Sequence, residues 1–340
     1  MAENSDVLQQ HRRWTVADAH ADSLMWNRDL TLAHEKGHVD FPRLHEGGVK
    51  LQCFTIVTRG LPVIDGFGLF ARWAGWPPEA RASEWARCTW QIDRLVDACQ
   101  RSNGSAAVTA SSAELEANLE QGRLSAVLGV EGAHALEGRV DRVAELHRRG
   151  VRFMSLTHLS NNELGGTSTP GLGNRALRPL GREVLEAMAA TGMVLDLAHA
   201  SRAMLGELLE FKGRLFCSHA AVSAVRPLWR NLDDDTLRAV ADRGGVVGII
   251  FAPQYLGGST LAHLARHVKH AVAVMGESGV ALGSDFDGMV PLPKELRDAR
   301  DLPKVSQALV DAGLSLGEVE RVMGENLRRF FAEVLGSAGR

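Results

Sequence analysis

The sequence predicts an α/β protein, a (β/α)8 barrel, and three observations indicate this fold. Short apolar, β-branched segments recur eight times along the chain, and most of them are followed by a stretch of helical periodicity. Polar residues stand at the carboxyl end of nearly every apolar segment. The alternation of strand and helix favours parallel pairing, and 340 residues are somewhat more than the roughly 250 typical of this barrel.

The eight predicted strands follow one another in a regular order. They are residues 16–23, 49–58, 125–132, 152–160, 192–201, 214–223, 244–252 and 279–288. Helical segments lie between them, and several end at a glycine, as helices commonly do. These are residues 82–100, 139–150, 181–192, 201–213 and 233–245. The longest irregular stretch, 58–80, follows the second strand and is rich in glycine, proline and tryptophan.

An open doubly wound sheet is the alternative fold. Two features speak against it: no GxGxxG motif follows the first strand, and the polar residues end nearly all strands instead of gathering at one switch point. No internal repeat, low-complexity tract or linker is visible. We therefore expect residues 1–340 to form one domain, with its core over about 16–330.

Composition favours small-molecule chemistry. With 38 Lys and Arg against 41 Asp and Glu, the formal net charge is −3, and both signs are interspersed, so no basic surface for nucleic acid or anionic lipid is expected. The cysteines form no CxxC pair, which argues against a zinc knuckle or a disulfide scaffold. They are Cys53, Cys88, Cys99 and Cys217.

The amino-terminal segment, MAENSDVLQQHRRW, lacks the apolar core of a secretory signal, and no apolar run approaches the length of a membrane span. We expect a cytoplasmic protein without a membrane anchor.

The first strand contains the segment VADAHADSL, in which Asp18, His20 and Asp22 occupy every second position. Since side chains alternate between the two faces of a strand, the three polar groups share one face. Burying them together is costly unless they are paired or bound to a metal. A solvent-facing edge strand is the other interpretation of this segment alone.

Comparable residues end the other apolar segments. Each taken alone has a simpler explanation, as a hydrogen-bonded core histidine or a helix cap. In a barrel, however, all of them project toward one mouth, where the active sites of this fold lie. The set comprises His20, Asp22, Glu131, His158, His199, His219, Asp285 and Asp287.

Imidazole and carboxylate ligands without thiolate favour zinc or a similar divalent ion. The set is too large for one tetrahedral ion with an open position, so it suits two ions that share a ligand. Glu131 lies on a strand between the two groups of ligands and is the expected bridge.

The ordered motifs DAHADS, GVEG, THLSNN, DLAHAS, CSHAAV, RPLWRN and GSDFDG resemble those of the membrane dipeptidase (renal dipeptidase) family of binuclear zinc metallopeptidases, in the amidohydrolase superfamily. The resemblance runs from about residue 16 to 330. It implies a barrel of the metal-dependent hydrolase type. The animal members are secreted and lipid-anchored. Because this sequence shows neither the apolar core of a secretory signal nor a hydrophobic anchor signal, it resembles the bacterial, soluble branch.

The resemblance also implies a role for each site residue. His20 and Asp22 would hold one zinc, His199 and His219 the other, and Glu131 would bridge the two. For the remaining positions, Asp285 would handle the proton of the attacking water, His158 would polarise the scissile carbonyl, and Arg230 in RPLWRN would bind the substrate carboxylate.

The expected activity is therefore hydrolysis of the peptide bond of dipeptides, including those with a carboxyl-terminal D-residue. Two alternatives remain open at this point. One is an amidohydrolase acting on another small amide, lactam or lactone, and the other is a metal-binding barrel without catalysis. Asp287 is expected to be structural, and Asp18 to support a ligand or pack lower in the barrel. The tryptophan-rich loop, with Trp73 and Trp76, either covers the substrate or forms a subunit contact in a homodimer.

Overall fold

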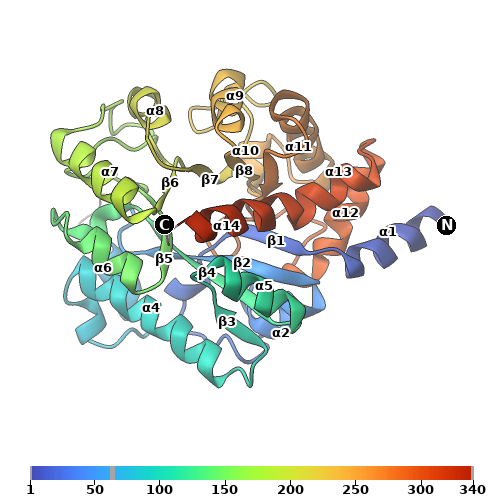
Figure 1. Ribbon diagram of the computed structural model, residues 1–340, viewed down its shortest axis with the longest axis horizontal. Coiled ribbons are helices and arrows are strands. Elements are labelled where there is room, and N and C mark those ends of the chain that lie inside the picture. Colours follow the sequence, from blue (N-terminus) through green and yellow to red (C-terminus); the bar gives the residue numbers. More distant parts are fainter. Residues whose placement is uncertain (1, 62–65, 338–340) are drawn as a thin grey trace.

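The computed structural model describes residues 2–61 and 66–337 of the chain. Parallel strands lie at its centre and helices surround them (Figure 1). The order of the strands is β1-β2-β4-β5-β6-β7-β8-β9, and all eight predicted strands are among them. Their bounds are β1 Val16–Ala21, β2 Val49–Val57, β4 Leu124–Glu131, β5 Val151–Ser155, β6 Val194–Asp196, β7 Leu215–Ala220, β8 Val246–Ile249 and β9 Val280–Leu282.

The chain just after β9 returns to β1 and closes the ring of strands. Ala21 forms a parallel bridge with Phe286, and the amide of Asp22 donates a hydrogen bond of 2.8 Å to the Phe286 carbonyl. This contact brings the polar residues that follow β1 and β9 side by side. The predicted (β/α)8 barrel is confirmed, and the open doubly wound sheet is excluded.

The five predicted helices correspond to α4, α6, α7, α8 and α9. Polar caps start several of them: the side chains of Ser83, Ser201 and Asp233 each accept a hydrogen bond from the amide three residues later. The helices are α1 Ala2–Arg13, α2 Phe41–Glu46, α3 Gly66–Trp73, α4 Glu84–Arg101, α5 Ser112–Glu120, α6 Arg142–Arg148, α7 Pro179–Thr191, α8 Arg202–Leu209, α9 Asp234–Asp242, α10 Pro253–Leu256, α11 Leu261–Met275, α12 Leu302–Asp311, α13 Leu316–Glu320 and α14 Asn326–Ser337.

Helix α14 closes the amino-terminal end of the barrel. It lies across the strands in the view of Figure 1, and its Phe330 and Phe331 belong to the apolar cluster that fills the barrel interior. The ring of Phe216, at the start of β7, stacks on Phe330 with centroids 5.5 Å apart. Because aromatic packing fills this end, the carboxyl-terminal end is left as the mouth, where this fold places its active sites.

Two elements differ from the prediction. A ninth strand, β3 (Ala106–Val108), pairs with β4 outside the ring; its three small residues gave no strand pattern. The stretch 58–80 is less irregular than expected, because it contains α3 and a short 3₁₀ helix, Glu79–Arg81. Glycines at 66 and 68 concealed α3, whose Phe67 and Ala71 are nevertheless buried. That the whole chain forms a single domain stays a prediction.

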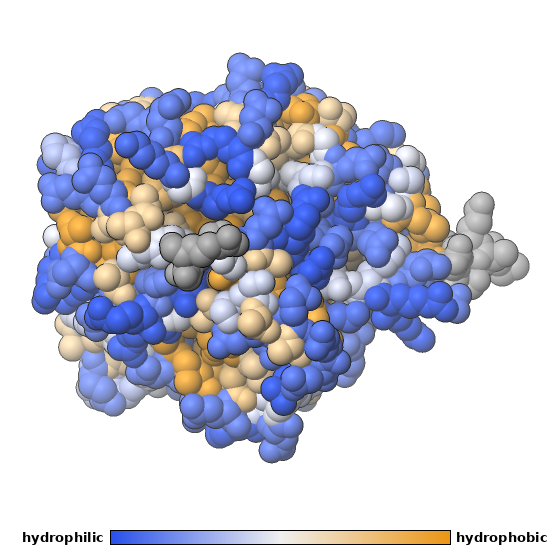
Figure 2. All heavy atoms as spheres, viewed as in Figure 1, coloured by the Kyte–Doolittle hydropathy of each residue, from blue (hydrophilic) through white to orange (hydrophobic). Residues whose placement is uncertain are grey.

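The face covered by α14 and the outer helices is mainly hydrophilic, with smaller separate apolar patches (Figure 2). Among the described residues, no helix combines the length and the apolar character needed to cross a membrane.

Candidate metal centre and substrate pocket

Every predicted site residue lies at the mouth, and all except Arg230 stand at or just beyond the end of a strand. The positions follow from the barrel, which collects the carboxyl ends of its strands at one place. His20 is in β1 with Asp22 just after it, Glu131 is the last residue of β4, His158 and His199 each come three residues after a strand, His219 is in β7, and Asp285 is three residues past β9. The structure brings all of these residues together, together with Arg230 from the loop after β7.

Glu131 lies at the centre of the group. Its Oε1 is 2.8 Å from Nε2 of His199, 3.4 Å from Nε2 of His219 and 3.7 Å from Nε2 of His20. Its Oε2 is 3.4 Å from Nε2 of His158. All five side chains are buried. Four imidazoles therefore point the same ring nitrogen at one buried carboxylate.

Asp22 and Asp285 complete the group on the β1 side. Oδ1 of Asp22 is 3.4 Å from Nε2 of His20, and Oδ1 of Asp285 is 4.0 Å from the same nitrogen. Three sets of possible ligand atoms lie within 4.8 Å of one another among the described residues. They are His20, Glu131 and His219; Glu131, His158 and His199; and His20, Asp22 and Asp285.

The donor set fits divalent cations. Nε2 of His199 and Nε2 of His219 are only 3.1 Å apart, so two lone-pair-bearing nitrogens face one another across the centre. Oε2 of Glu131 is buried and accepts no hydrogen bond from the described residues. Nitrogen and carboxylate oxygen donors without sulfur are the set that zinc and related ions take. Crowded lone pairs and an unsatisfied carboxylate oxygen are both relieved by bound cations.

Hydrogen bonds behind the ligands orient them. The Ser218 hydroxyl lies 3.1 Å from Nδ1 of His20 and 2.9 Å from Nδ1 of His219, which leaves Nε2 of each ring facing the centre. Thr55, on β2, donates a hydrogen bond of 2.6 Å to Oδ1 of Asp22. Nδ1 of His158 donates to the carbonyl of Arg59 at 2.8 Å. Partners of this kind commonly fix the tautomer and direction of metal ligands.

The buried carboxylates of the centre favour positive charge nearby. Burial, strengthened by the charges of Arg230 and the neighbouring imidazoles, lowers the pKa of His199 well below its usual value, so this ring is neutral and free to act as a ligand. Burial also raises the pKa of Asp285 well above its usual value, and Asp22 and Glu131 add to the effect. For His20, burial is outweighed by Glu131 and Asp22, which raise its pKa to about 10. The buried carboxylates thus favour positive charge beside them. A proton supplies one such charge, and bound cations would supply it as well.

The loop that carries Asp285 has an unusual backbone. Asp285, Asp287 and Met289 all have positive φ, at 60°, 65° and 60°. A Cβ on Gly288 would lie 2.0 Å from Oδ1 of Asp285, so only glycine leaves room for that carboxylate. Non-glycine residues in the left-handed region cost of order 1 to 3 kcal/mol each and persist where the surroundings impose them.

Asp287 holds this loop in place. Its carboxylate accepts hydrogen bonds of 2.6 Å from the Ser23 hydroxyl, 2.6 Å from Nη2 of Arg28 and 2.8 Å from the amide of His38. Asp18, as expected, lies lower in the barrel: it accepts hydrogen bonds from Gln52 and from the amide and hydroxyl of Ser284. Both aspartates therefore anchor the segment that directs Asp285 into the centre.

Arg230 is buried beside the metal centre, 6 % exposed. Its Nη2 donates to the carbonyl of His219 at 3.1 Å and lies 3.3 Å from Nε2 of His199. Its guanidinium lies over the ring of Tyr255, 5.5 Å from the centroid, and its Nε has no partner among the described residues. A buried, stacked guanidinium with a free N–H is suited to a ligand carboxylate.

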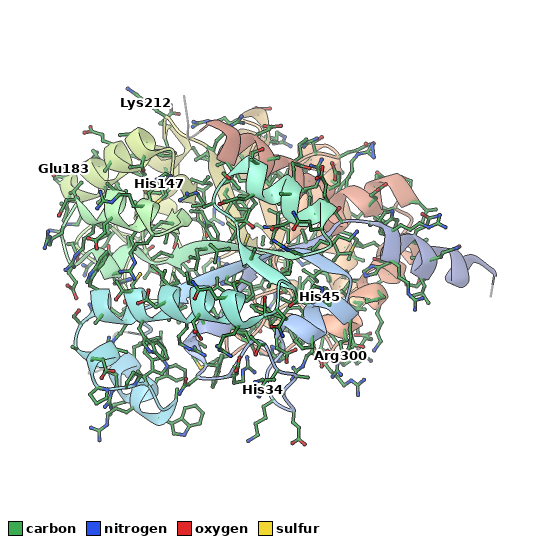
Figure 3. All side chains as sticks on the ribbon, turned by 60° about the horizontal axis from the view of Figure 1, so that its bottom comes forward. His34, His45, His147, Glu183, Lys212 and Arg300 are labelled. Atoms are coloured by element: carbon green, nitrogen blue, oxygen red, sulfur yellow. The ribbon has the colours of Figure 1, made fainter. Side chains whose placement is uncertain are left out.

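A cavity of about 280 Å³ opens over the centre and is lined by the site residues, by Tyr255 and by apolar side chains. A larger groove, about 910 Å³, runs between α11 and α12 and contains none of the strand-end residues. Other histidines, such as His34, His45 and His147, lie on peripheral loops and helices away from the strand ends (Figure 3). The chemistry of the chain is thus concentrated at the mouth.

Sequence reasoning missed several residues of the site. Thr55, Ser218 and Arg28 act through neighbours that the fold alone brings close. Tyr255 could have been noticed in the sequence, because it is the single tyrosine of the chain and follows the seventh predicted strand.

The two tryptophans of the loop at 58–80 differ in exposure. Trp73 is 75 % exposed, whereas Trp76 is buried and donates to the Met25 carbonyl at 2.9 Å. Trp76 is therefore neither a cover over the mouth nor a subunit contact.

Comparison with known proteins agrees with this geometry. The model of a family described as membrane dipeptidase (peptidase family M19) matches residues 2–338. The dipeptidase aclJ of Aspergillus oryzae is 30% identical over 352 residues, covering 97% of this chain and 80% of that protein. An uncharacterized dipeptidase of Schizosaccharomyces pombe is 26% identical over 92% of this chain and 79% of its own length.

Solved structures share the fold. A metallo peptidase from Rhodobacter sphaeroides, liganded with a phosphinate mimic of the dipeptide L-Ala-D-Ala, superimposes with a TM-score of 0.80 at 23% identity, covering 94% of this chain and 98% of that one. The probable dipeptidase PvdM from Pseudomonas aeruginosa gives a TM-score of 0.82 at 18% identity, covering 97% and 99% of the two chains.

Proposed function

Because the chain belongs to the membrane dipeptidase family, peptidase family M19, and is a metallodipeptidase, we propose that it hydrolyses dipeptides at a centre of two zinc ions bridged by Glu131. One observation carries the proposal: four imidazoles surround one buried carboxylate, and a buried guanidinium lies 3.3 Å from one of them inside a small pocket. His20 and Asp22 would hold one ion, and His199 and His219 the other. Two such ions, when bound, supply an ionised water and polarise the scissile carbonyl.

The chain's own residues position and activate the substrate. The carboxylate of the dipeptide pairs with Arg230, which fixes the peptide bond over the centre. With Nδ1 donating to the Arg59 carbonyl, His158 also donates from Nε2 to the carbonyl oxygen when both ring nitrogens carry a proton, and so stabilises the negative charge that develops there. Asp285 takes the proton of the attacking water and delivers it to the leaving amine as the carbon–nitrogen bond breaks. Water and peptide bond thereby yield one carboxylate and one free amine.

The size of the pocket supports a dipeptide over a longer peptide. Its volume of about 280 Å³ falls at the lower limit of ligand pockets, which span roughly 300 to 1,000 Å³. The position of Arg230 sets the same limit, because the guanidinium is buried and meets a carboxylate only one residue beyond the cleaved bond. A small amide, lactam or lactone without a carboxylate beside the scissile bond would leave Arg230 unpaired, whereas a dipeptide supplies its partner.

A carboxyl-terminal D-residue is expected to be accepted. The neighbouring structure from Rhodobacter sphaeroides holds a mimic of L-Ala-D-Ala, which motivates the same expectation for this chain. We expect L-Ala-D-Ala and L-Ala-L-Ala to be hydrolysed with kcat/KM values of similar order, measured by release of free alanine. A purified enzyme that cleaves L-Ala-L-Ala while leaving every L,D dipeptide intact would remove this expectation and leave the mechanism standing.

Replacing Arg230 with Ala should lower kcat/KM for a free dipeptide by about ten- to a hundredfold, since a charge-assisted hydrogen bond contributes about 1.5 to 3 kcal/mol. The variant should lose little on the dipeptide amide, which offers no carboxylate and which we expect to be a poor substrate of the wild type. Arg226→Ala is the matched control, because Arg226 is exposed in the same loop. Equal hydrolysis of dipeptide and dipeptide amide by the wild type would show that Arg230 is not the anchor.

Two expectations from the sequence, a cytoplasmic location and assembly as a homodimer, stay predictions. The exposed Trp73 and Leu69 on α3 are the side chains that we propose for a subunit contact.

A further inference from the structure

The substrate pocket is divided into a polar and an apolar part. Its polar side chains are those of the metal centre together with Arg230 and Tyr255, and each has a place in the proposed reaction or beside it. The other side chains that line it are apolar. They are Met25, Val57, Phe67, Leu159, Met289 and Val290.

Three of the apolar residues, Met25, Val57 and Phe67, belong to one buried apolar cluster, and we refer to them as the apolar wall. Val57 ends β2, Met25 follows β1, and Phe67 lies on α3, which follows β2. In the ring order β1-β2-β4-β5-β6-β7-β8-β9, strand β2 is four positions from β7, which is the opposite side of an eight-stranded ring. Arg230 follows β7. The apolar wall therefore faces Arg230 across the metal centre.

From this arrangement we propose that the amino-terminal residue of the dipeptide carries an uncharged, apolar side chain, which packs on the apolar wall. The inference rests on the proposed function: with the substrate carboxylate at Arg230 and the peptide bond over the metals, the amino-terminal residue must reach the far side of the pocket. That side is where Met25, Val57 and Phe67 lie.

The apolar wall is firmly supported from behind. Phe67 is 7 % exposed and packs edge-on against the buried Trp76, with ring centroids 5.8 Å apart. Trp76 in turn packs on Trp90 at 4.3 Å and donates to the carbonyl of Met25. Gln91 donates to the carbonyl of Val57 at 2.8 Å. Because the backbone groups are satisfied and the aromatic side chains are packed, the wall presents a fixed apolar surface.

Such a surface selects against charge. A lysine or glutamate side chain at this position would lose its water, and the described residues of the apolar wall offer it neither a counter-ion nor a hydrogen bond. A linear or branched aliphatic side chain would gain contact area instead. The buried Arg87 lies over the ring of Phe67, 5.7 Å from its centroid, but is not among the residues that line the pocket.

The test compares substrates with matched side chains. L-Norleucyl-L-alanine and L-lysyl-L-alanine share the same four-carbon chain, which in lysine ends in an additional ammonium group. L-Glutamyl-L-alanine carries the opposite charge, and L-alanyl-L-alanine is the reference. We expect kcat/KM for the norleucyl substrate to exceed that for the lysyl substrate by roughly a hundredfold, and that for L-alanyl-L-alanine by roughly tenfold. Equal rates for the lysyl and norleucyl substrates would overturn the proposal.

A substitution in the apolar wall tests whether this surface causes the preference for an apolar side chain. Phe67→Ala should reduce the ratio of norleucyl to alanyl kcat/KM by roughly tenfold, and Phe67→Leu should restore most of it. Phe70→Ala is the matched control, because Phe70 lies on the same helix but does not line the pocket. The ratio is measured within one protein sample, so partial unfolding of a variant cancels. An unchanged ratio in Phe67→Ala would contradict the assignment, whereas failure to cleave any dipeptide would contradict the proposed function itself.

Discussion

Asp285→Asn is expected to lower kcat by roughly 10² to 10⁴ while zinc content stays at the wild-type level. The amide keeps the shape of the carboxylate but cannot take a proton from water. Asp285 lies 4.0 Å from His20, and its loop is fixed by Asp287 and Gly288, so the substitution leaves the direction of the side chain unchanged.

The measurement is steady-state hydrolysis of L-Ala-L-Ala together with metal analysis of the same sample. Asp242→Asn serves as the control, because Asp242 is exposed at the end of α9. Near-normal kcat in Asp285→Asn with full metal content would move the proton-transfer role to another residue. Loss of metal along with activity would make Asp285 a ligand and not a base.

Glu131→Gln should reduce the affinity for both metal ions together. Among the residues that the structure describes, Glu131 is the one carboxylate within 4 Å of the imidazoles of His20, His199 and His219, so its charge contributes to both halves of the centre. Loss of a partner behind a metal ligand typically costs 10- to 100-fold in affinity or activity, and loss of the shared ligand should cost more.

Zinc affinity is measured by titration with a competing chelator, and activity follows in parallel. Glu183→Gln is the matched control, since Glu183 is exposed on α7, far from the mouth (Figure 3). If Glu131→Gln weakened only one of two sites, Glu131 would be an ordinary ligand of that site and the bridge would have to be another group.

The sequence was sufficient to predict which residues gather at the mouth, because strand ends meet there in any closed barrel. His20, Asp22, Glu131 and His219 lie in or next to strongly apolar strands, so their place could be read from local pattern. Their detailed arrangement could not. The 3.1 Å approach of His199 and His219 depends on the register of β6 against β7, which no local pattern determines.

No local sequence pattern identifies the residues that support the proposed metal ligands. Thr55 and Ser218 are small polar residues in strands, and only the pairing of β2 with β1 and the approach of β7 to β1 across the barrel interior give them partners. The positive φ of Asp285 is imposed by the hydrogen bonds of Asp287 to segments more than 200 residues away. Apolar residues in loops, such as Met25 and Phe67, look the same in sequence whether they fill a core or line a pocket.

The most direct test of the two-metal dipeptidase is to add zinc stepwise to the metal-free protein while following hydrolysis of L-Ala-L-Ala. The proposed centre predicts that activity rises until two zinc ions are bound per chain and then stays constant, with Glu131→Gln showing no such plateau. A plateau at one zinc per chain, or full metal binding without hydrolysis of any dipeptide, would contradict it.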